Sequence, residues 1–222
     1  MLKIFETVEL MKKLDEIKVA YEKKRYDTAF LGTAEEALKD IEEWKYSTGA
    51  IFDQPPHGDE MGGFAGGRLL KKQYPSPYEA RLKGAYSSGF INGQHRVTVS
   101  PSAPVNIPLD VARFRWEDDT LHTEHIKYYN HLGFQSAKAP ALTAMSTFYA
   151  FDKNIRADVG VGISDAYSIF LYYYNEKNLI ETASMVTAPY DFQSEYQMQY
   201  DEHDVLVSVM SGDVIVWRAK SR

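Results

Sequence analysis

The segment Gly66–Gly93 reads G-G-R-L-L-K-K-Q-Y-P-S-P-Y-E-A-R-L-K-G-A-Y-S-S-G-F-I-N-G and decides the predicted fold. Two β-like runs flank a turn at Pro75–Pro77. In the second run the side chains alternate, with Tyr78 and its even-numbered neighbours on one side and Glu79 and its odd-numbered neighbours on the other. The corner Ser87-Ser88-Gly89 closes the unit. This half-polar, half-apolar ribbon predicts one layer of an antiparallel β-sandwich.

The chain after this segment alternates short β-like runs with turns rich in Asp and Asn. The candidate strands are 95–100, 110–117, 121–129, 144–151, 155–162, 167–174, 179–186, 194–200, 204–210 and 213–219. Many short strands at near-regular spacing are typical of an antiparallel sandwich or barrel. We therefore predict a mainly β fold, with a β-sandwich domain over residues 68–222.

The N-terminal region has a different pattern. Residues 7–26 carry apolar side chains at the spacing of an amphipathic helix. A second helix is predicted over 33–46, because Thr33 and Glu36 form a capping-box pattern. Residues 1–46 thus read as a helical hairpin appended to the sandwich, or as an oligomerising arm. Residues 47–67 are rich in Gly and Pro and predict a loop.

Composition excludes several classes of protein. The 222 residues carry a net charge of −6, which disfavours non-specific nucleic-acid binding. With no cysteine, the chain has no disulfide and no thiolate metal ligand. No apolar run is long enough for a signal peptide or a membrane span, so we expect a cytoplasmic protein that does not bind membranes. His57-Gly-Asp59 has the spacing of an iron-binding motif but lies among breakers, so we expect no metal and no cofactor.

Two stretches resemble a known family. Gly66–Gly89, and Tyr190–Arg218 (Y-D-F-Q-S-E-Y-Q-M-Q-Y-D-E-H-D-V-L-V-S-V-M-S-G-D-V-I-V-W-R), resemble strands of lichenase- and laminarinase-type β-glucanases, members of the concanavalin-like jelly-roll superfamily. The resemblance covers about a third of the chain. It implies a jelly roll with a concave sugar-binding cleft. Because later strands of that family are missing, it leaves open a rearranged topology or a sheet edge completed by a partner.

The resemblance also implies where catalysis should occur, and the required residues are absent. The family's signature is E-x-D-x-E, in which two glutamates perform retaining hydrolysis. The corresponding stretch here is Pro108-Leu109-Asp110-Val111-Ala112. Pro108 and Ala112 cannot ionise. Glucanase chemistry at this strand is therefore not expected.

Other polar residues on the predicted strands could still form a site. Asp110, His122 and Glu124 are candidates for acid–base catalysis if the protein is an enzyme. Cross-strand charge pairing on a solvated face is the competing interpretation. Gly160-Val-Gly162, near Asp158, is too short for a phosphate loop. Candidate ligand-binding side chains combine arginines with aromatic rings: Arg113, Arg115, Trp116, Tyr128, Tyr172 and Tyr174.

Three functional hypotheses follow from these residues. The first is a non-catalytic module that binds a glycan or another small molecule, or serves in an assembly. The second is an enzyme with altered chemistry, such as a lyase, isomerase or cyclase, acting in the same cleft. The third is a structural subunit, forming a homo-oligomer or binding an assembly partner through the N-terminal helices or an open sheet edge.

Overall fold

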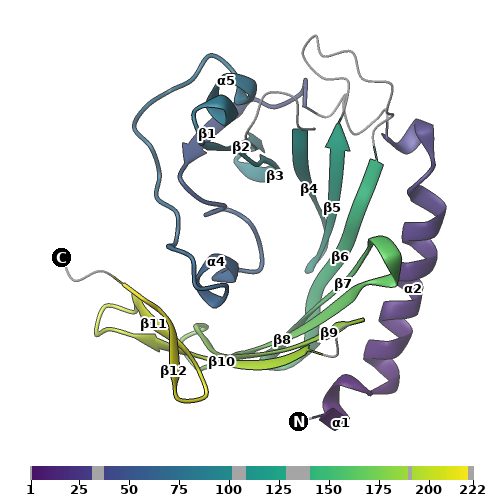
Figure 1. Ribbon diagram of the computed structural model, residues 1–222, viewed down its shortest axis with the longest axis vertical. Coiled ribbons are helices and arrows are strands. Elements are labelled where there is room, and N and C mark those ends of the chain that lie inside the picture. Colours follow the sequence, from purple (N-terminus) through teal and green to yellow (C-terminus); the bar gives the residue numbers. More distant parts are fainter. Residues whose placement is uncertain (1, 32–37, 102–108, 129–140, 190–191, 220–222) are drawn as a thin grey trace.

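The computed structural model describes residues 2–31, 38–101, 109–128, 141–189 and 192–219. In this part of the chain, twelve antiparallel strands form one sheet whose spatial order follows the sequence (Figure 1). The strands are β1 (Glu43–Ser47), β2 (Tyr86–Ile91), β3 (Gln94–Val99), β4 (Leu109–Glu117), β5 (Thr120–Tyr128), β6 (Ala141–Asp152), β7 (Ile155–Gly162), β8 (Tyr167–Tyr174), β9 (Ile180–Ala188), β10 (Phe192–Tyr200), β11 (Leu206–Ser211) and β12 (Val214–Arg218).

Four α-helices and one short 3₁₀ helix lie wholly within the described ranges and accompany the sheet. They are α1 (Leu2–Phe5), α2 (Val8–Lys24), α4 (Gly58–Met61), α5 (Pro77–Leu82) and η1 (Ile163–Asp165), and residues 28–31 are also helical. None of the helices in the described ranges is both long and apolar enough to cross a membrane.

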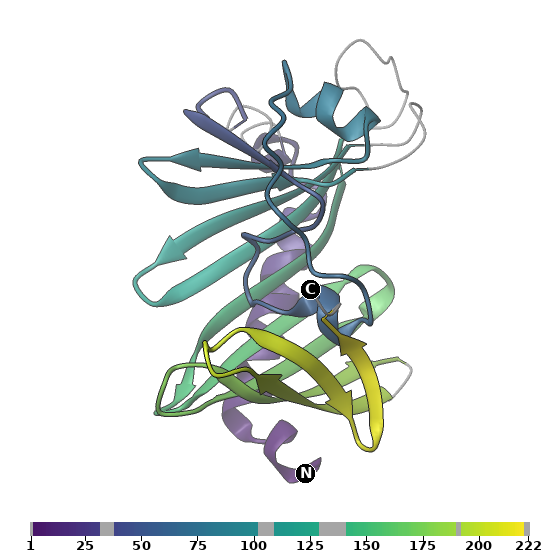
Figure 2. The same cartoon turned by 90° about the vertical axis from the view of Figure 1, so that its left-hand side faces the viewer.

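The sheet is strongly curved and has two distinct faces (Figures 1 and 2). Helix α2 lies along the outside of the curve, which we call the convex face. The connection between β1 and β2, residues 48–85, crosses the inside, which we call the concave face. Within this connection, α5 contacts β2 and α4 contacts β12. The connection therefore reaches from one end of the sheet to the other.

Helix α2 is held on the convex face by its apolar side. Leu10, Leu14, Ile17 and Tyr21 are all buried, at the spacing that brings them to one side of a helix. They pack in one core with convex-face residues of the strands, including Val159 and Leu171. Burial of this kind contributes about 1.5–3 kcal/mol for each large side chain.

A second core lies on the concave face. It contains buried aromatic and aliphatic residues such as Phe114, Phe148 and Tyr172 from the middle strands. Met61 of α4 joins the same core as Val209 of β11. The connection across the concave face is thus anchored by apolar contacts at the β12 end of the sheet.

The predicted mainly β, antiparallel fold is confirmed, and so are most strand positions. The sandwich and its jelly-roll order are not confirmed, because the twelve strands belong to a single sheet in which sequence neighbours pair. Most of these sequential pairs are joined by short turns, whereas β1 and β2 are joined by the long connection over residues 48–85. The turn between β2 and β3 shows this locally, since Asn92 and Gly93 both adopt positive φ, as a two-residue hairpin requires.

The helix over 7–26 is confirmed as α2, but three other local predictions are wrong. Residues 43–46 of the second predicted helix form β1, which pairs with β2, while residues 32–37 lie outside the described ranges. The predicted strand at Tyr78–Ala85 is largely helix α5. Ser76 caps this helix by accepting a hydrogen bond from the Glu79 backbone N–H at 3.2 Å, and Pro77 occupies its first turn. The expected Ser-Ser-Gly corner is the interior of β2.

Candidate functional site

Strand pairing places two contrasting rows of side chains next to each other on the concave face. One row, which we call the small row, consists of Thr123, Ser146, Gly160, Ser168 and Thr187 on β5 to β9. The adjacent row on the same strands is Leu121, Phe148, Asp158, Phe170 and Met185, which we call the aromatic row. Because the rows are two residues apart on each strand, they face the same side of the sheet.

A pocket of about 460 Å³ opens over the small row. Its lining includes Ser146, Gly160 and Ser168 from that row, together with His125 and Asp158. Gly160 keeps the floor low, since a Cβ atom there would lie 3.2 Å from both Ser146 Cβ and Ser168 Oγ. Its few convergent polar groups, in a concave space of this volume, are a feature that it shares with small-molecule sites.

Asp158 is the most unusual group in this pocket. Its Oδ1 atom is buried and has no hydrogen-bond partner among the described residues. Burial raises the pKa of its carboxyl from 3.8 to about 6, and a hydrogen bond that the Ser146 hydroxyl donates to the carboxyl opposes the shift. The neighbours paired directly with Asp158 are Phe148 on β6 and Phe170 on β8. A carboxylate between two aromatic residues is a group that a ligand could complete.

His125 contributes a neutral imidazole to the same pocket. Burial lowers its pKa, with the nearby charge of Asp110 acting in the opposite direction. At neutral pH the ring is therefore uncharged and can offer one hydrogen-bond donor and one acceptor.

A separate polar cluster joins the β1–β2 connection to the sheet. The Thr98 hydroxyl donates a 2.5 Å hydrogen bond to Oδ1 of Asp53, and His95 Nε2 lies 3.0 Å from Thr98 Oγ1. Burial raises the pKa of Asp53 to about 7 and lowers that of His95 to about 4. The His95 ring also packs on Phe114, with ring centroids 4.5 Å apart. The cluster fastens the connection, because Asp53 belongs to it and Thr98 to β3.

The three residues that the sequence offered for acid–base catalysis, Asp110, His122 and Glu124, do not lie together in the structure. Asp110 lies on the concave face, in the same alternation as Ala112 and Phe114. Glu124 lies on the convex face, where its carboxylate receives a 2.8 Å hydrogen bond from Lys24 of α2. His122 shares that face and lies 3.4 Å from Glu117. The sheet therefore separates Asp110 from the other two, and Glu124 serves to hold the helix.

The candidate ligand-binding residues are divided between the two faces in the same way. Arg113 and Arg115 lie on the convex face, where they pair with Glu124 at 3.8 Å and with Glu117, respectively. Trp116, Tyr172 and Tyr174 pack in the concave core. Tyr172 is only 2% exposed, so it supports the core and offers no stacking surface.

Two residues named in the sequence analysis cannot be placed in the structure. The side chain of Tyr128, at the end of β5, and Pro108 of the glucanase-like stretch lie outside what the structure describes.

The pocket residues themselves were not among the sequence candidates. Asp158, Ser146 and Ser168 are far apart in sequence and occur singly in apolar strands. Alternation along β7 was the one available signal, because it places Arg156, Asp158 and Gly160 on the same side. Nothing in the sequence alone aligns β7 with Ser146 and Ser168.

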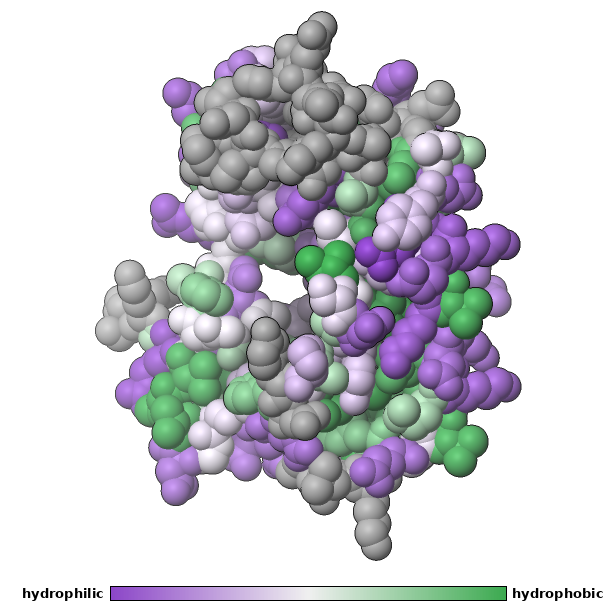
Figure 3. All heavy atoms as spheres, turned by 45° about the vertical axis from the view of Figure 1, so that its right-hand side comes forward, coloured by the Kyte–Doolittle hydropathy of each residue, from purple (hydrophilic) through white to green (hydrophobic). Residues whose placement is uncertain are grey.

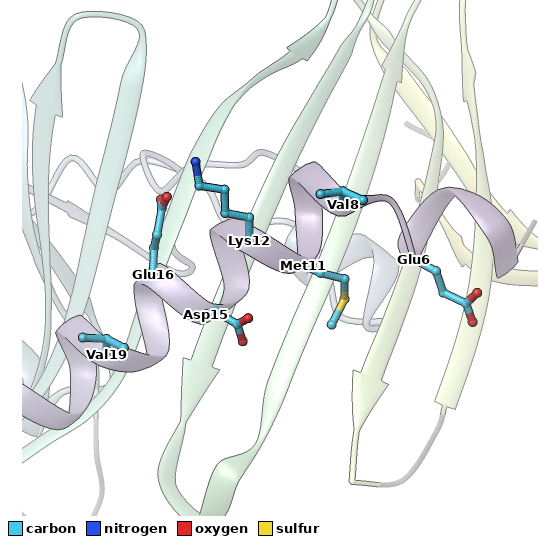
Figure 4. Close-up of a pocket in the computed structure, with 7 residues that line it drawn as sticks. All are labelled: Glu6, Val8, Met11, Lys12, Asp15, Glu16 and Val19. Carbon is cyan, nitrogen blue, oxygen red and sulfur yellow. The ribbon is translucent and has the colours of Figure 1, made fainter.

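A larger hollow, of about 760 Å³, lies on the outward side of α2 (Figure 4). Its lining comes from α2 and from Glu6, which lies two residues before the helix, and side chains such as Val8, Lys12 and Val19 spread apart along the surface. Hydrophilic residues dominate much of the right-hand side of Figure 3, with isolated hydrophobic ones among them. This surface lacks convergent groups, and oligomerisation through it stays a prediction.

The described residues contain no group of three or more His, Asp or Glu side chains arranged for a metal ion. His57 lies instead near Glu60, at 4.0 Å, and beside the ring of Tyr200.

Comparison with protein-family models, curated proteins and solved structures finds no match. The resemblance to β-glucanases therefore stays a hypothesis, and the site has to be interpreted from its own geometry.

Proposed function

We propose that this protein binds a small organic molecule in the concave pocket. The observation that carries the proposal is the combination of a low floor at Gly160 with a half-buried carboxyl at Asp158, whose Oδ1 atom has no hydrogen-bond partner among the described residues. Buried polar groups are normally satisfied, and an unsatisfied one costs about 1–3 kcal/mol. A ligand that supplies the missing donor would recover part of that cost.

The overall architecture supports the same function. Antiparallel strands in sequential order, curved around a covered interior, are the arrangement in which β-barrels hold single small ligands. The described part of the sheet has this order, and the β1–β2 connection spans its inner side (Figure 2). The pocket volume of about 460 Å³ fits a small molecule better than a polymer.

The glycan hypothesis is narrowed by this arrangement. Arg113 and Arg115 face away from the concave pocket, so they cannot contact a sugar bound there. Any glycan in the pocket would have to be small and would rely on Ser146, Asp158 and Ser168 for its hydroxyls. We regard this as one subset of the small-molecule proposal.

The test is ligand-observed NMR with a library of small, chemically diverse fragments. Ala144→Leu would place a larger side chain in the pocket, which Ala144 lines. Ala150→Leu makes the same change on the same strand at an exposed position outside the pocket lining. Fragments should bind the wild type and Ala150→Leu, and lose at least tenfold in affinity with Ala144→Leu. Equal binding by all three proteins would refute the pocket as the site.

A further inference from the structure

The geometry of the aromatic row points to a specific class of ligand: an organic cation, such as a protonated aryl-alkylamine, whose ammonium group contacts the Asp158 carboxylate. This inference rests on the proposed function, since it names the chemistry of the ligand for the same pocket.

Charge recognition would come from Asp158. Residues paired directly across an antiparallel sheet have Cβ atoms about 4.5–5.5 Å apart, which places Phe148 and Phe170 at the two sides of this carboxyl. A cation at the carboxylate would therefore lie within reach of one or both rings. Cations are attracted to aromatic faces within about 6 Å, more strongly where water is excluded.

One of the two rings already contacts a cation. The guanidinium carbon of Arg156 lies 5.6 Å from the centroid of Phe148. Phe148 is 3% exposed, so this contact occurs in partly dehydrated surroundings. The second ring, Phe170, has no such contact among the described residues and stacks in parallel with Tyr172, with centroids 5.8 Å apart. Phe170 is partly buried and lies beside the pocket through its pairing with Asp158.

Asp158 has no ion-pair partner in the described ranges. The titratable groups that face it from its own and neighbouring strands are Arg156 on β7, His125 on β5 and Tyr172 on β8. The guanidinium of Arg156 lies over Phe148 and forms no ion pair with Asp158, His125 is kept neutral by burial, and Tyr172 is neutral. No ion pair among the described residues therefore compensates the negative charge of Asp158 at neutral pH.

An anionic ligand would be repelled by this carboxylate, and a neutral donor would form a hydrogen bond without neutralising its charge. An ammonium group supplies the hydrogen bond and the opposite charge together, so its pairing with the carboxylate is the stronger one. A cation also removes the unfavourable burial of an unpaired charge, which neither alternative does.

The experiment compares matched pairs of aryl-alkylamines and the corresponding alcohols, for example phenethylamine and 2-phenylethanol, by titration calorimetry at pH 7.5. We expect every amine that binds to have an affinity at least tenfold higher than that of the corresponding alcohol. Asp158→Asn should remove this preference, because the amine should lose much more affinity than its alcohol. Amine affinity to the wild type should also fall several-fold between pH 7.5 and pH 5, as Asp158 becomes protonated.

The outcomes separate this inference from the function on which it rests. If alcohols bind in the pocket as tightly as amines, and Asp158→Asn changes neither affinity, the preference for a cationic ligand is refuted, whereas the proposal of small-molecule binding stands. If no compound of either kind binds, and the fragment library also yields no ligand sensitive to Ala144→Leu, the proposed function itself fails. The pH titration of the wild type needs no variant, so a folding defect in Asp158→Asn would not rescue the inference.

Discussion

Replacing Asp158 by Asn should make the protein more stable at neutral pH. The carboxyl has a pKa of about 6 in the folded chain and 3.8 as its ordinary value, so its ionised form is less favourable in the folded state. A difference of one pKa unit corresponds to about 1.4 kcal/mol, which gives an upper value of roughly 3 kcal/mol. Because the residue is only half-buried and lines an open pocket, we expect about 1–2 kcal/mol.

The pH dependence gives this prediction its sign. Below pH 3.8 the carboxyl is protonated in both the folded and the unfolded chain, and it costs nothing. As the pH rises from about 4 to about 6, the unfolded chain ionises first, and stability is lost. Above that range the loss is complete. The stabilisation by Asp158→Asn should therefore be larger at pH 7.5 than at pH 5.

Urea denaturation followed by circular dichroism at both pH values measures this difference. Asp213→Asn, which makes the same change at an exposed position in the β11–β12 turn, is the matched control and should alter stability little. A destabilised Asp158→Asn protein, or a stabilisation that is equal at the two pH values, would show that Asp158 is compensated in the folded state. Asp158 would then have no uncompensated charge for a ligand to neutralise.

Three further predictions concern the rest of the framework, each checked by denaturation. Leu14→Ala, in the buried side of α2, should cost about 2–5 kcal/mol, whereas Val19→Ala on the exposed side of the same helix should cost little; equal losses would contradict the packing of α2 on the sheet. Glu124→Gln should destabilise by about 1–3 kcal/mol because it weakens the buried pairing with the helix, while Glu16→Gln, on the helix surface, should have no measurable effect. Asp53→Asn should flatten the loss of stability that the raised pKa of Asp53 causes between about pH 4 and pH 7, and an unchanged pH profile would refute that assignment.

The strands were predictable because their pattern is local. In β8, alternating Ile169 and Leu171 face the helix and Phe170 faces the concave side, a period of two that the sequence displays directly. Asx-rich turns marked the ends of most strands, and the first helix followed from the spacing of its apolar residues. The fold class and the positions of the strands could therefore be predicted without knowledge of long-range contacts.

The errors arose where local patterns have two meanings. Ser76-Pro-Tyr-Glu79 follows a β-like alternation, yet it also contains a cap and a proline that begin a helix, and α5 forms there. The choice between a sandwich and one curved sheet depends on which strands pair, and that information lies in contacts between distant residues.

The site could be predicted least of all. Alternation correctly assigned His122 and Glu124 to one side of β5, but it could not show that this side lies under α2. Asp110 faces the opposite side because of its parity with Phe114 on β4. Asp158 gained its importance only from neighbours on β6 and β8, which the sequence does not bring together.

The most direct test of small-molecule binding on the concave face is a structure of the protein with the tightest fragment found by screening, determined by crystallography or by intermolecular NMR contacts. The ligand should lie against Ser146, Gly160 and Ser168, with its donor group at Asp158. A ligand bound along the outward side of α2, with the concave pocket empty, would contradict the proposal.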